Sequence, residues 1–64
     1  MEPQEDFDKV VQVLNSCENL EQLKTANNMF ENFKKKWKGK IYDLDLISFM
    51  YNFESEYNKK KDKL

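Results

Sequence analysis

The sequence predicts a small all-α domain, a three-helix bundle, on three observations. Apolar residues recur at helical spacing in three separate segments, short polar stretches divide these segments, and 64 residues leave room for one domain with one core. We therefore expect a single helical domain over residues 1–64, with helices near 3–15, 19–38 and 43–61.

The central helix has the clearest signature. At about 100° per residue, its apolar side chains fall within an arc of roughly 80°. These side chains are Leu23, Ala26, Phe30, Phe33 and Trp37. Asn19 and Gln22 have the spacing of a capping box, and Gly39 follows a run of lysines as the residue just past a helix end. The segment therefore has a start, a buried face and an end.

The first helix begins where Pro3 suits a first helical turn and nearby acids complement the helix dipole. Its apolar stripe, at i, i+3, i+4 and i+7, is Phe7, Val10, Val11 and Leu14. The polar run at 15–18 is long enough only for a turn, so the first two helices should be neighbours. Cys17 in this run is expected as a small, half-buried residue; the alternative is a reactive thiol.

The third helix is expected to begin at Asp43 as N-cap, with Tyr42 and Ile47 forming a hydrophobic staple around it. Its charged end at 58–63 should fray, with Leu64 returning to the apolar face. A strand over 41–46 is the alternative, but it would lack a pairing partner.

We expect the three apolar faces to form one core. Its predicted members are Phe7, Val10, Leu14, Leu23, Phe30, Phe33, Trp37, Leu46, Met50, Phe53 and Tyr57. Truncating either Trp37 or Phe30 to Ala should then cost about 3–5 kcal/mol.

Composition argues against catalysis and against a bound cofactor or metal. The chain has no His, one Cys and one Gly, so it offers no neutral-pH proton shuttle, no disulfide and no glycine-rich phosphate loop. The carboxylates of Asp43 and Asp45 could bind a divalent cation, but helix capping and complementation of the helix dipole explain the pair without one. Glu54 and Glu56 point about 200° apart and cannot converge. We expect no enzyme and no small-molecule substrate.

No apolar run approaches the roughly 20 residues of a membrane span, and the N-terminus resembles no secretion signal. We therefore expect a cytoplasmic protein that does not engage a membrane.

A basic cluster at 34–40 is the strongest local charge signal. Its members are Lys34, Lys35, Lys36, Lys38 and Lys40. Together with Trp37 they suit phosphate contacts and base stacking, which makes accessory nucleic-acid binding an alternative function. The competing interpretations are a solvated helix end, with Glu31 pairing with Lys35, or contact with an acidic protein.

The third helix carries more large side chains than one small core should absorb. Leu44 and Tyr51, about 20° apart, lie well off its main apolar face, and together with Ile47 they form our candidate protein-binding patch. The alternative is that the first two helices cover both flanks of the third.

The segment Ser16-Cys17-Glu18-Asn19-Leu20-Glu21-Gln22-Leu23-Lys24-Thr25-Ala26, followed by aromatic residues and a lysine-rich tail, resembles short helical-hairpin proteins of small DNA phages. The resemblance covers residues 16–38. It implies a phage or mobile-element origin and an αα-hairpin core, and it carries no binding residues across, because the function of those proteins is mostly unassigned.

The leading hypothesis is a small non-catalytic module that docks a helical face on a partner protein or on its own copy, in the host cytoplasm if the protein is viral. Nucleic-acid binding through the lysines is the alternative, as is a structural role in a larger assembly.

Overall fold

The computed structural model describes residues 2–64 and contains three α-helices. Helix α1 spans Pro3–Asn15, α2 spans Leu20–Trp37 and α3 spans Asp43–Lys63. No strand occurs within the described residues, so the strand alternative at 41–46 is wrong. The predicted three-helix fold is confirmed, with α2 one residue shorter at each end than expected and α3 two residues longer.

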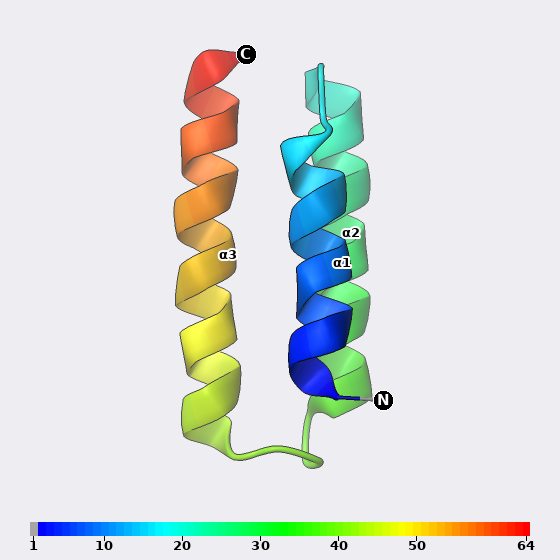
Figure 1. Ribbon diagram of the computed structural model, residues 1–64, viewed down its shortest axis with the longest axis vertical. Coiled ribbons are helices and arrows are strands. Elements are labelled where there is room, and N and C mark those ends of the chain that lie inside the picture. The colour runs from blue at the N-terminus through cyan, green and yellow to red at the C-terminus, as the bar shows by residue number, and fades with distance from the viewer. Residues whose placement is uncertain (1) are drawn as a thin grey trace.

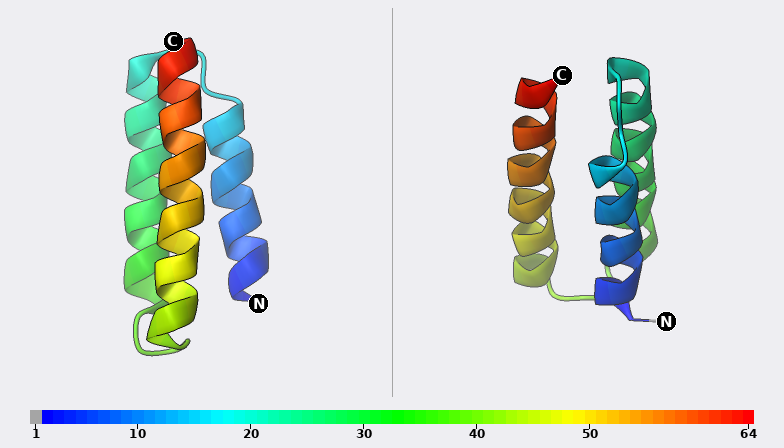
Figure 2. Two further views of the ribbon diagram at one scale, coloured as in Figure 1. Left: turned by 90° about the vertical axis from the view of Figure 1, so that its left-hand side faces the viewer. Right: turned by 45° about the horizontal axis from the view of Figure 1, so that its top comes forward.

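The helices run in alternating directions, and α3 lies over the seam between α1 and α2 (Figures 1 and 2). The chain's N-terminal end and the α2–α3 connection lie at the same end of the bundle, which we call the loop end. The α1–α2 connection and the C-terminus lie at the opposite end, the turn end. The loop end therefore gathers residues from the beginning and the middle of the sequence.

Local chemistry sets the ends of α2. Asn19 is the N-cap, and its side chain accepts a hydrogen bond of 2.9 Å from the backbone N–H of Gln22. The Gln22 side chain reaches back to accept one of 2.6 Å from the N–H of Glu18, one residue earlier than in a standard capping box. At the other end Gly39 adopts a φ of 81°, the left-handed conformation that glycine takes without strain.

Helix α3 begins differently from the prediction. Tyr42 is its N-cap, no side chain caps the helix, and Asp43 is its first residue. The negative charge of Asp43 thus lies in the first turn, where it interacts favourably with the positive end of the helix dipole. Tyr42 is 83% exposed, which leaves it too little buried surface for the expected staple with Ile47.

The core is aromatic and draws on all three helices. Its buried members are Phe7, Val10, Leu14, Cys17, Leu23, Ala26, Phe30, Phe33 and Phe53. Phe30 of α2 and Phe53 of α3 stack with ring centroids 4.2 Å apart and planes within 5°. Phe7 of α1 meets Phe30 at 6.1 Å and Phe49 of α3 at 4.8 Å. These contacts join the three helices through a few large side chains.

The core differs from the prediction at several positions. Met50 is 39% exposed and lies outside it, while Trp37, Leu46 and Tyr57 are only partly buried against it. Cys17 is buried, not half-buried, because the turn folds it onto the helices. Leu64 is exposed and does not return to the core.

One polar contact holds the long α3 at the turn end. The Lys60 ammonium donates a hydrogen bond of 2.8 Å to the backbone carbonyl of Asn15, the last residue of α1. A cation at a helix C-terminus satisfies a carbonyl that lacks an intrahelical partner. Helix α3 reaches Lys63, two residues beyond the expected end, and the fraying of residues 58–63 stays a prediction.

Candidate protein-interaction surface

The outward side of α3 carries exposed apolar side chains. At about 100° per residue, Leu44, Ile47 and Tyr51 fall within an arc of roughly 60° on the side opposite Phe53, which faces the core. Their exposed fractions are 79%, 44% and 71%. The first two helices do not cover them, so the predicted patch is on the surface.

Met50 extends this surface sideways, a residue that the sequence pattern had assigned to the core. We name Leu44, Ile47, Met50 and Tyr51 the α3 patch. Beside Met50 lies an open groove of about 210 Å³ between α2 and α3. Its lining is Asn27, Phe30, Glu31, Lys34, Met50, Phe53, Glu54 and Tyr57. The patch thus runs from the outward side of α3 toward a partly apolar groove.

Two of the five clustered lysines are held by acids. Lys36 forms an ion pair of 2.7 Å with Asp6, and Lys34 forms one of 2.8 Å with Glu31. The expected Glu31 pair with Lys35 is therefore replaced by the pair one residue earlier. Lys35, Lys38 and Lys40 are exposed.

The loop end also gathers acids around these lysines. Glu2 is the N-cap of α1, Glu5 and Asp6 lie in its first turn, and Asp43 and Asp45 lie in the first turn of α3. The starts of both helices lie at the loop end (Figure 1). These five acids match the five lysines in number. The basic run seen in the sequence is thus embedded in an end of mixed charge in the folded chain.

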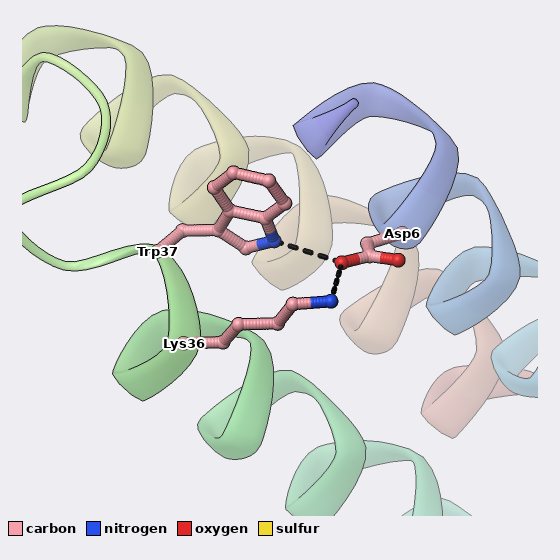
Figure 3. A network of polar contacts seen from close by, with 3 residues as sticks. All are labelled: Asp6, Lys36 and Trp37. Carbon is pink, nitrogen blue, oxygen red and sulfur yellow. Dashed lines mark hydrogen bonds and ion pairs between the residues drawn. The ribbon is translucent and has the colours of Figure 1, made fainter. Parts of the chain in front are cut away.

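Asp6 links α1 to the end of α2 (Figure 3). One of its oxygens accepts a hydrogen bond of 2.7 Å from the Lys36 ammonium and another of 2.9 Å from the Trp37 indole N–H. The bond from Lys36, followed by the bond from Trp37, lowers the pKa of the Asp6 carboxyl below its ordinary value. Trp37 is thus a partly buried hydrogen-bond donor to Asp6. No local sequence pattern indicates a contact between residues 31 positions apart.

Among residues 2–64 there is no group of three or more His, Cys, Asp or Glu side chains placed to hold a metal ion. Asp43 and Asp45 lie on opposite flanks of α3, about 200° apart. The pair is explained by its place in the first helical turn.

Cys17 is enclosed and already has a partner. It is 3% exposed, and its Sγ lies 3.2 Å from the carbonyl oxygen of Val13, to which the thiol donates. A shallow depression adjoins it, lined by Val13, Ser16, Cys17, Gln22 and Thr25. A buried thiol bonded to the backbone acts as a small core residue.

None of the helices in the described residues is long and apolar enough to cross a membrane. Comparison with known proteins gave no matching family model, no matching curated protein and no matching solved structure.

Proposed function

We propose that this protein is a small non-catalytic binding module that docks the α3 patch on another protein. The observation that carries the proposal is the exposure of three apolar side chains directly opposite the core face of α3. These exposed side chains lie outside the core, so they contribute little to the stability of the bundle. Large apolar side chains grouped on an otherwise polar surface are typical of protein-binding sites. Action in the cytoplasm, of a host cell if the protein is of phage origin, belongs to the same proposal.

A peptide selection against the immobilised protein tests this function. Peptides enriched on the wild-type protein should bind the variant Tyr51→Glu at least about tenfold more weakly, because a charge within the patch must be desolvated on docking. The matched control is Gln12→Glu, which adds the same charge at an exposed position of α1. Circular dichroism should show both variants folded.

The proposal fails if enriched peptides bind Tyr51→Glu as well as they bind the control. It also fails if selection enriches no binder and the protein remains monomeric at every concentration.

Nucleic-acid binding is the second candidate, supported by three exposed lysines of the cluster, Lys35, Lys38 and Lys40, that form no ion pair with an acid among residues 2–64. Fluorescence anisotropy with labelled single- and double-stranded DNA and RNA, at low and at physiological salt, distinguishes the two. Phosphate contacts predict binding that weakens steeply with salt, whereas the matching acids at the loop end predict no binding even at low salt. Tight, salt-sensitive binding would make nucleic-acid binding through the lysines the better-supported function, in place of protein binding through the α3 patch.

A further inference from the structure

We propose that the partner of the α3 patch is an amphipathic helix of another protein whose apolar stripe is flanked by lysine or arginine. This inference rests on the proposed function and names the chemistry of the partner. It follows from the shape of the patch, from the charges around it and from its limited area.

The shape of the patch suits a helix. Leu44, Ile47 and Tyr51 have the spacing i, i+3 and i+7, which extends over about 10 Å, or two helical turns. Ser48 and Ser55 are small, exposed residues on the same side of α3. Small residues beside large ones form the ridges and grooves into which a second helix packs.

The border of the patch is acidic. Asp43 and Glu54 lie on one flank of α3 and Asp45 on the other, and all three are exposed. Between residues 43 and 58 the chain contains no lysine or arginine. A partner that carries positive charges beside its apolar stripe therefore meets complementary charge on both flanks.

Two lysines from other elements approach this border. Lys34 shares the α2–α3 groove with Glu54, but it forms its ion pair with Glu31. Lys40 lies beside Asp45 at the loop end. One lysine against three acids leaves the border of the patch negative.

A second copy of this chain fits less well. An antiparallel pair centred on the patch would bring two sets of the three acids into one interface, where like charges oppose association. The area is also small. With about 250 Å² for a large side chain, the exposed parts of the four patch residues amount to less than about 600 Å², below the roughly 800 Å² per partner of a standard interface. An area of this size suits a weak, transient contact with a single helix and not a stable dimer.

The test uses two designed helical peptides with the same Leu-Phe-Leu stripe, one flanked by lysine and arginine and the other by glutamate. Isothermal titration calorimetry should show the basic peptide binding at least about tenfold more tightly. The triple variant Asp43→Asn, Asp45→Asn and Glu54→Gln should reduce this preference at least about fivefold.

The control triple variant, Glu5→Gln, Glu18→Gln and Glu21→Gln, removes the same charge from exposed positions on other elements. It should keep the preference of the wild-type protein. Tyr51→Glu should abolish binding of both peptides.

The failures of the two proposals are distinguishable. Equal binding of the two peptides, lost in Tyr51→Glu, would overturn the basic partner and leave the protein-binding function standing. Binding of neither peptide, with a solution mass that rises with concentration only when Tyr51 is intact, would assign the patch to a second copy instead. Binding of neither peptide by a constant monomer would overturn the basic helical partner, and the peptide selection described above then decides the protein-binding function.

Discussion

At the scale of single residues, the fold depends on aromatic side chains that each touch more than one helix. Phe30 is buried, stacks on Phe53 of α3 and meets Phe7 of α1. Small domains have only a few kcal/mol of net stability, so losing one such side chain matters to the whole chain.

Phe30→Ala should therefore cost about 3–5 kcal/mol, the range for removing a buried aromatic ring. The measurement is urea unfolding followed by circular dichroism, in which the variant should show little or no folded baseline. Tyr51→Ala, which removes an exposed ring, should change the free energy of unfolding by less than about 0.5 kcal/mol. Wild-type-like unfolding of Phe30→Ala would show that the assigned core is wrong.

Asp6 makes a second residue-scale prediction, on pH. Its pKa is lowered in the folded protein by the hydrogen bonds from Lys36 and Trp37. A carboxyl with a lowered folded pKa contributes stability that is complete above its unfolded pKa of about 3.9 and is lost as the pH falls through the folded value. Asp6→Asn should thus lower the melting temperature at pH 7 and reduce its dependence on pH below about 5.

The matched control for this change is Asp62→Asn, an exposed carboxyl near the end of α3. Melting temperatures measured from pH 7 to pH 2 by circular dichroism, with Trp37 fluorescence as a local probe, compare the two variants with the wild type. An Asp6→Asn curve that parallels the wild-type curve would exclude this contribution.

At the scale of elements, helix ends with local chemistry are the most predictable. The Asn19 cap, the start of α1 at Pro3 and the glycine after α2 were all predictable, because each depends on residues within a few positions. Asp43 was misassigned because a carboxylate suits both an N-cap and a first turn, and sequence alone does not separate the two.

Asn19→Ala should destabilise the protein by about 1 kcal/mol, because it removes the acceptor for the Gln22 N–H. Asn28→Ala is the control, since Asn28 is exposed within α2 and alanine favours a helix there. In urea unfolding, Asn19→Ala should lower the midpoint, whereas Asn28→Ala should leave it unchanged or raise it. The free energies of unfolding of the two variants should therefore differ by at least about 1 kcal/mol, the cost of losing the cap. Equal midpoints would mean that the cap does not stabilise α2.

At the scale of the whole molecule, helical periodicity was enough to predict three helices and most of their buried faces. Periodicity did not predict that Met50 is exposed. The apolar face of α3 is wider than the seam between α1 and α2, so a residue at the edge of that face stays outside the core. The ties from Lys36 to Asp6 and from Lys60 to Asn15 join residues 30 and 45 positions apart. Such pairs depend on how the helices pack, and no local pattern encodes them.

The candidate site also has one part that the sequence predicts and one part that it does not. Leu44, Ile47 and Tyr51 were predictable as a surface, because helical geometry places them opposite the core residues of the same helix. The balance of charge at the loop end was not, because it requires the start of the chain to fold beside the end of α2. The sequence therefore overstated the basic character of residues 34–40.

The most direct test of the central claim is a nitrogen-15 nuclear magnetic resonance titration of the protein with the lysine- and arginine-flanked helical peptide. We expect the amide shift changes to concentrate in residues 43–55 of α3 and to disappear in Tyr51→Glu. Shift changes centred on residues 34–40, or on the turn end, would contradict docking through the α3 patch.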